Sequence, residues 1–117
     1  MKINYQSLEK KIDLKFKNKD LLIQALTHKS FNPNENNEKI EFLGDRVLGL
    51  VIAKKLLEIY PEEKEGILDK KFASLVNKKT CLDIAKKINL ASYVKTFNPN
   101  NKKIKIEDKI ISDSCEA

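Results

Sequence analysis

Apolar residues recur every three or four positions along most of this chain, a spacing that places them on one face of a helix. No run alternates apolar and polar residues in the way that a half-buried strand does. The pattern predicts a short helix capped by Ser7 that runs through Asp13, and a second helix capped by Asp20. Further apolar positions predict helices that contain residues 67–76, 82–88 and 106–117. The chain is therefore predicted to be all-α.

The longest predicted helix follows a loop at residues 31–37 (FNPNENN) and ends near Tyr60 and Pro61. Its second half, from Val47 to Leu57, is apolar on nearly every side. A helix that is apolar all round is ordinarily buried, so we expect this half to lie inside the hydrophobic core. Two more loops are predicted, a charged turn at residues 62–66 and a polar segment (FNPNNKK) at residues 97–103.

The start of the long helix carries three carboxylates at spacings of three and four: Glu38, Glu41 and Asp45. At these spacings side chains share one stripe of a helix, so their negative charges converge. Like charges at helical spacing are destabilising, and more so where water is excluded. A bound cation would explain why the stripe is retained.

A second acidic pair, Asp113 and Glu116, shares one face of the last helix. Two helices that each offer a pair of carboxylates can build an oxygen-ligand site for Mg²⁺ or Mn²⁺. Zinc is not expected, because His28 is the only histidine and the two cysteines are isolated in the sequence. The alternative is that the pair are surface acids neutralised by Lys109, and the pair alone does not decide between these interpretations.

Length and composition predict a single domain of 117 residues with one hydrophobic core. No stretch reaches the length of about 20 apolar residues that a membrane span needs, and the first residues lack the apolar segment of a signal peptide. We therefore expect a soluble cytoplasmic protein. The cysteines, Cys81 and Cys115, are expected to be reduced thiols in the core.

The charge is strongly positive, with 23 basic against 17 acidic residues and a net charge of +6. Lysines attract phosphate groups, whereas carboxylates repel them unless metal ions intervene. A basic surface around an acidic focus thus suits a polyanionic substrate and a metal-dependent step. Composition alone is equally compatible with a lysine-rich protein that binds no polyanion.

Three motifs resemble those of the ribonuclease III family, bacterial ribonuclease III above all. NEKIEFLGD at residues 37–45, preceded by ALTHKS at 25–30, resembles the family signature, and ISDSCEA at 111–117 resembles its second acidic motif. The intervening EGIL at residues 65–68 also fits. The resemblance implies an all-helical endonuclease domain that cuts double-stranded RNA, leaving 5′-phosphate and 3′-hydroxyl ends, in the processing of ribosomal and messenger RNA precursors.

The resemblance also implies roles for individual acids. Glu41, Asp45, Asp113 and Glu116 match the metal-binding and catalytic positions of the family, and Glu38 and Glu65 match further acidic positions near that site. Two divalent ions, about 4 Å apart, could activate a water and stabilise the departing 3′ oxygen. We expect Glu41, Asp113 and Glu116 to ligate metal directly, and Asp45 to complete the site and position the water. Asp45 and Glu116 are the predicted catalytic pair.

Phe42 lies beside the acidic face, away from the stripe that would face the core. Such an aromatic packs either under a loop of its own chain or on a partner. The resemblance favours the partner, because family members are homodimers in which an aromatic at this position inserts into the other subunit. His28 is expected to be structural and not a general base. Candidate contacts to RNA phosphates are the lysines at seven positions: Lys70, Lys71, Lys78, Lys79, Lys102, Lys103 and Lys105.

The chain departs from the family pattern at its end, where it stops one residue after Glu116. We expect an incomplete nuclease domain at residues 1–117, without the double-stranded RNA-binding domain that follows in bacterial members. Two alternatives remain: a catalytically silent RNA-binding or assembly module of the same fold, and a helical Mg²⁺-dependent phosphohydrolase acting on a nucleotide. Retention of all four acids favours the nuclease.

Overall fold

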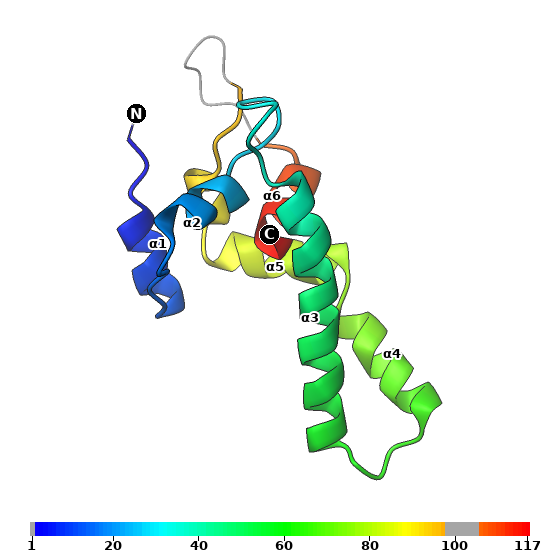
Figure 1. Ribbon diagram of the computed structural model, residues 1–117. Helices are drawn as coiled ribbons and strands as arrows, with labels where there is room; N and C mark the ends of the chain where they lie inside the picture. The colour runs from blue at the N-terminus through cyan, green and yellow to red at the C-terminus, as the bar shows by residue number, and fades with distance from the viewer. Residues whose placement is uncertain (1, 98–105) are drawn as a thin grey trace.

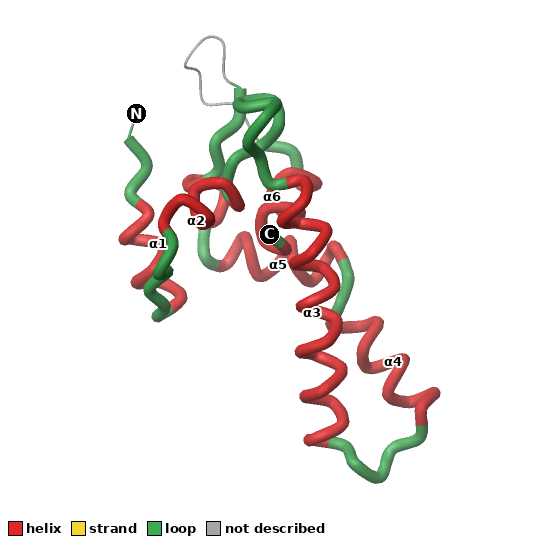
Figure 2. Tube along the Cα trace, in the orientation of Figure 1, coloured by secondary structure: helices red, strands yellow, loops and turns green. Residues whose placement is uncertain are grey.

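The computed structural model describes residues 2–97 and 106–117. These residues contain helices and loops and no strand (Figures 1 and 2), with a single parallel bridge between Thr27 and Lys95. The predicted all-α fold is confirmed. The elements are α1 (Tyr5–Ile12), α2 (Lys19–Ala25), α3 (Glu38–Ile59), α4 (Glu65–Leu75), α5 (Lys78–Lys87), a 3₁₀ turn η1 (Leu90–Tyr93) and α6 (Asp108–Glu116). Most of the loop predicted at residues 97–103 lies outside the described residues.

Asparagine side chains, and not Ser7 or Asp20, cap the first two helices. The side chain of Asn4 accepts a hydrogen bond from the backbone N–H of Ser7 at 3.2 Å, and that of Asn18 accepts one from the N–H of Leu21 at 3.2 Å. Asn is as good a cap as Ser or Asp, so the helix begins at the earlier of two suitable residues. Both predicted caps therefore lie inside the first turn of their helices.

The core is built from the part of the chain that precedes α3 and the part that follows α4. α1, α2, α5, η1 and α6 surround one buried cluster, and α6 packs against α5 and against the first turns of α3. The buried residues of this cluster are Leu8, Leu22, Leu26, Ala85, Leu90, Tyr93, Val94 and Ile111. The body therefore holds α6 beside the acidic start of α3.

The second half of α3 does not lie in this core, so the expectation that it is buried is wrong. α3 and α4 extend from the body as an arm (Figure 1), and the radius of gyration is 15.9 Å, against about 13 Å for a compact domain of this size. Leu56 is buried, but Val47, Leu50 and Leu57 are 49%, 71% and 60% exposed. An all-round apolar helix needs neighbours on all sides, and along the arm α4 covers only one side of it.

No helix within residues 2–97 and 106–117 combines the length and the apolar character needed to cross a membrane. Cys81 and Cys115 are free thiols, as expected; Cys81 is buried and Cys115 partly so.

Candidate metal centre

Asn37 fixes the start of α3 against both α2 and α6. Its buried side chain donates hydrogen bonds to the backbone carbonyl of Ala25 (3.1 Å) and to the hydroxyl of Ser114 (3.2 Å), and its backbone N–H donates to the carbonyl of Thr27 (3.0 Å). This role was not predicted from the sequence, because an Asn before a helix ordinarily caps it. Here the side chain of Asn37 makes no cap hydrogen bond and instead joins elements far apart in the chain.

Gly44 allows the backbones of α3 and α6 to approach closely. A Cβ atom built on Gly44 would lie 1.8 Å from the backbone carbonyl oxygen of Glu116 and 2.8 Å from its carbonyl carbon. Only glycine fits a position at which another backbone occupies the place of the Cβ. This contact accounts for the glycine of the NEKIEFLGD motif and brings the acids of the two helices within reach of one another.

Three of the four acids predicted to form the site converge. Carboxylate oxygens of Glu41, Asp113 and Glu116 all lie within 4.8 Å of one another. The side chain of Glu116 is 3% exposed, that of Asp113 18% and that of Glu41 27%. Asp45 is outside this group and lies 3.4 Å from the guanidinium of Arg46. Its charge nevertheless reaches the group, because it helps to raise the pKa of Glu116.

Two lysines contact the three acids, here called the acid cluster. The ammonium of Lys78, the first residue of α5, lies 3.2 Å from Glu41 Oε1, 2.7 Å from Asp113 Oδ1 and 2.9 Å from Glu116 Oε2. Lys109 contacts the other oxygen of Asp113 at 2.7 Å from within α6. The pairing of Asp113 with Lys109, considered above as an alternative to a metal site, is thus present. This pairing uses Oδ2 of Asp113, whereas Oδ1 of the same carboxylate contacts Lys78.

The electrostatics of the acid cluster follow from burial and from these lysines. Burial, together with the nearby Glu41 and Asp45, raises the pKa of Glu116 against the opposing hydrogen bond from Lys78. Burial also acts to raise the pKa of Asp113, but the hydrogen bonds from Lys109 and Lys78 outweigh it, and the net pKa is lowered. The site therefore combines a deeply placed carboxylate with a second one that stays ionised, an arrangement that a cation stabilises.

The donor set fits a hard divalent cation. Its ligand atoms are carboxylate oxygens from α3 and α6, which Mg²⁺ and Mn²⁺ prefer. Burial raises the pKa of the Cys115 thiol to about 11 and also raises that of Cys81. Both thiols are therefore protonated near neutral pH and offer no thiolate to a softer metal.

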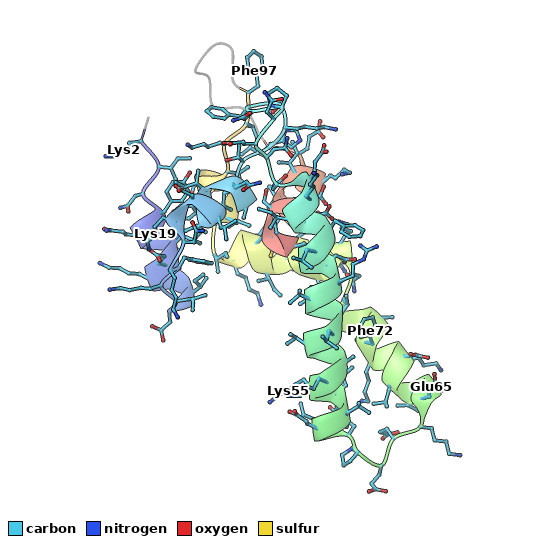
Figure 3. All side chains as sticks on the ribbon, viewed as in Figure 1. Lys2, Lys19, Lys55, Glu65, Phe72 and Phe97 are labelled. Carbon is cyan, nitrogen blue, oxygen red and sulfur yellow. The ribbon has the colours of Figure 1, made fainter. Side chains whose placement is uncertain are left out.

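The structure does not bring the two additional acids to the cluster. Glu38 is exposed at the start of α3 and pairs with Lys29 at 3.4 Å. Glu65 begins α4 at the far end of the arm (Figure 3). Phe42 is 59% exposed, with the guanidinium of Arg46 4.0 Å from its ring centroid.

Of the remaining candidates that the structure describes, only Lys78 contacts the acid cluster. The ring of His28 hydrogen-bonds Ser30 through Nδ1, at 2.7 Å to the hydroxyl. Lys70 and Lys71 are on α4, where the ammonium of Lys71 lies 4.2 Å from the ring centroid of Tyr60. Lys79 is exposed on α5. The other lysine candidates, Lys102, Lys103 and Lys105, lie outside the described residues.

Comparison with known proteins decides the family. A sequence model described as Ribonuclease-III-like matches residues 18–117. The chain belongs to the ribonuclease III family. The resemblance noted in the sequence is thereby confirmed, and the acid cluster lies in the two family motifs that carried it.

Curated relatives extend the match over the whole chain. Ribonuclease 3 of Pelagibacter ubique strain HTCC1062 is 68% identical over 117 residues, which are all of this chain and 53% of that protein. Ribonuclease 3 of Sulfurovum sp. strain NBC37-1 is 48% identical over 91 residues, 78% of this chain and 41% of that protein. The chain thus spans about half the length of these ribonuclease III relatives.

Solved structures show the same fold. Two structures of the nuclease domain of ribonuclease III from Campylobacter jejuni match with TM-scores of 0.85 and 0.84, at 41% and 42% identity. The matches cover 97% and 99% of this chain and 80% and 79% of the Campylobacter chains. The first of these structures is described as showing structural flexibility in a region involved in dimer formation. The predicted ribonuclease III nuclease-domain fold is therefore confirmed.

Proposed function

We propose that this chain is the nuclease domain of a divalent-metal-dependent endoribonuclease that cuts double-stranded RNA, leaving 5′-phosphate and 3′-hydroxyl ends. The observation that carries the proposal is the convergence of Glu41, Asp113 and Glu116 from the two motifs of the ribonuclease III family. Three acids at such short range on a chain of net charge +6 fit an enzyme that draws a polyanion towards bound metal.

Each acid of the proposed site has a distinct task. Glu41, Asp113 and Glu116 hold the metal, with Glu116 anchored by its burial and by the Gly44 contact. Asp45 lies one helical turn after Glu41 and is 45% exposed, so it can hold and orient a water on the open side of the cluster. When bound, two Mg²⁺ or Mn²⁺ ions supply an activated water and stabilise the charge that develops on the phosphate.

The exposed side of the arm supports a homodimer. Several large apolar side chains exposed along one helix are typical of a binding interface, and α4 leaves them uncovered. Phe42 lies at the end of this face next to the acid cluster, and two copies would present two clusters to one duplex. The exposed apolar residues of the face are Phe42, Leu43, Val47, Leu50, Val51 and Leu57.

The RNA substrates and the cellular location are proposed by analogy with the family. We propose precursors of ribosomal and messenger RNA as substrates, met in the cytoplasm. Lys70, Lys71 and Lys79 are the described lysines proposed to contact the duplex, whose backbone and shape are what such proteins read.

Incubation with end-labelled duplex RNA and Mg²⁺ tests the nuclease proposal. Both the chain and a chimera that continues past Ala117 with the corresponding part of the Pelagibacter protein would be assayed. We expect the chimera to cut the duplex to 5′-phosphate ends, and Glu116→Gln to abolish cutting without loss of folding. The proposal is wrong if the chimera does not cut, or if the Glu116→Gln variant cuts equally well. Binding of the duplex without cleavage would identify a silent RNA-binding module, and hydrolysis of mononucleotides a phosphohydrolase.

A further inference from the structure

The ammonium of Lys78 lies where a cation bound by the acid cluster would lie. It is within 3.2 Å of one oxygen on each of the three acids, Glu41, Asp113 and Glu116. These three oxygens belong to the same carboxylates that are proposed to ligate metal. Lys109, by contrast, contacts Asp113 from the outside of the cluster and only through Oδ2.

The position of Lys78 is explained by the acids and not by its own helix. Lys78 is the first residue of α5, where the positive end of the helix dipole disfavours a cation. Its side chain is 57% exposed, so no packing forces it into the cluster. Burial opposes its charge, yet hydrogen bonds to Asp113, Glu116 and Glu41 outweigh burial and raise its pKa further above the ordinary value. The three carboxylates therefore draw this side chain in.

We propose that Lys78 is a tethered competitor of the metal: its ammonium and the divalent cation require the same carboxylate oxygens, so metal binds only as the Lys78 side chain leaves the cluster. This inference rests on the metal site of the proposed function. While Lys78 is in place it neutralises part of the repulsion among the acids and keeps their carboxylates converged. Its long exposed side chain can then turn into solvent without any repacking of the core.

The competition has a measurable size. A ligand that binds only the fraction of molecules with a free site has its dissociation constant raised by the inverse of that fraction. Partly exposed ion pairs are individually weak, but three of them act here on one ammonium. Removal of the ammonium is therefore expected to tighten metal binding about tenfold.

The test is the affinity for Mn²⁺ alone, measured by electron paramagnetic resonance without RNA. Lys78→Met should bind Mn²⁺ about tenfold more tightly than the unaltered chain, and Lys78→Arg, which retains a cation, should not gain this affinity. Lys79→Met is the matched control, because it removes the same charge from the next residue of α5, and we expect its affinity to change less than about twofold. Equal affinity of Lys78→Met and the unaltered chain, or an equal gain in Lys79→Met, would overturn the proposal.

A second measurement needs no variant. Acetylation of each lysine by an amine-reactive ester, followed by mass spectrometry, should be slow at Lys78 in EDTA and faster in Mn²⁺, relative to Lys79. An unchanged ratio would also overturn the proposal.

Glu116→Gln distinguishes a failure of the proposed metal site from a failure of the proposed competition by Lys78. If this variant binds Mn²⁺ as the unaltered chain does, the proposed metal site is wrong and the role of Lys78 falls with it. If it loses Mn²⁺ while Lys78→Met gains nothing, the metal site stands and only the competition is refuted.

Discussion

Gly44→Ala is the most direct test of how the acid cluster is assembled. The added methyl carbon would lie 1.8 Å from the carbonyl oxygen of Glu116, whereas a carbon and an oxygen in contact are about 3.3 Å apart. The atoms that this methyl group would meet belong to the backbone of Glu116 and Ala117, so no side chain can turn aside to make room. α6 must then shift by about 1.5 Å, a displacement that also moves the Glu116 carboxylate away from Glu41 and Asp113.

The cost can be bounded from this geometry. Overpacking of this kind destabilises by about 1–3 kcal/mol, and the better helix propensity of Ala returns about 1 kcal/mol at most. We expect a net loss of up to about 2–3 kcal/mol in the free energy of unfolding, measured by urea denaturation. Because the displaced Glu116 no longer reaches the cluster, the affinity for Mn²⁺ should fall as well.

Gly66→Ala is the matched control. Nothing lies within 4 Å of a Cβ at Gly66, which is in α4 on the arm, so this change should be neutral or stabilising by up to about 1 kcal/mol. The proposed role of Gly44 is refuted if Gly44→Ala unfolds at the same urea concentration as Gly66→Ala and binds Mn²⁺ equally well.

Three further predictions address the anchor of α3, the proposed interface and the dependence on pH. Asn37→Ala should lower the free energy of unfolding by about 2–4 kcal/mol, because Ser114 and the Ala25 carbonyl lose a buried donor; urea denaturation measures this, and a loss below about 0.5 kcal/mol would contradict it. Phe42→Asp should shift sedimentation towards the monomer, whereas Phe31→Asp, at another exposed phenylalanine in a loop, should not; an unchanged state in Phe42→Asp would show that Phe42 does not anchor a dimer. Glu9 has a lowered pKa because it accepts hydrogen bonds from Lys19 and from the backbone N–H of Phe16. The ionised carboxylate therefore stabilises the folded chain fully above its ordinary pKa of 4.5, and this stabilisation is lost as the pH falls through the lower pKa of the folded state. The difference in melting temperature between the unaltered chain and Glu9→Gln should accordingly shrink below pH 4.5, and a constant difference would argue against it.

The helices and the acid pairs were predictable because they depend on local spacing. The periodicity of apolar residues located α3 and its end near Tyr60. Spacings of three and four residues indicated that acids gather on one face of α3 and on one face of α6, and three of them, Glu41, Asp113 and Glu116, converge in the structure. Local spacing does not say which helices meet. The close contact at Gly44 is therefore evident only in the folded chain.

Other features depended on contacts across the chain. Lys78 is 37 residues from Glu41 and 38 from Glu116 in sequence, so its charge gave no sign that it would enter the cluster. The exposure of α3 was mispredicted for a different reason. An apolar periodicity shows that a surface avoids water, but it does not say whether the same chain or another one covers it.

The bare side of the arm has a consequence for how this protein holds together. Full burial of each Val or Leu side chain contributes about 1.5–3 kcal/mol. Along α3 part of that contribution is missing, because Val47, Leu50, Val51 and Leu57 are about half exposed or more. If a second copy covers them, part of the free energy of folding is realised only on association. The melting temperature would then rise with protein concentration, so that the abundance of the chain would itself govern how much of it is folded.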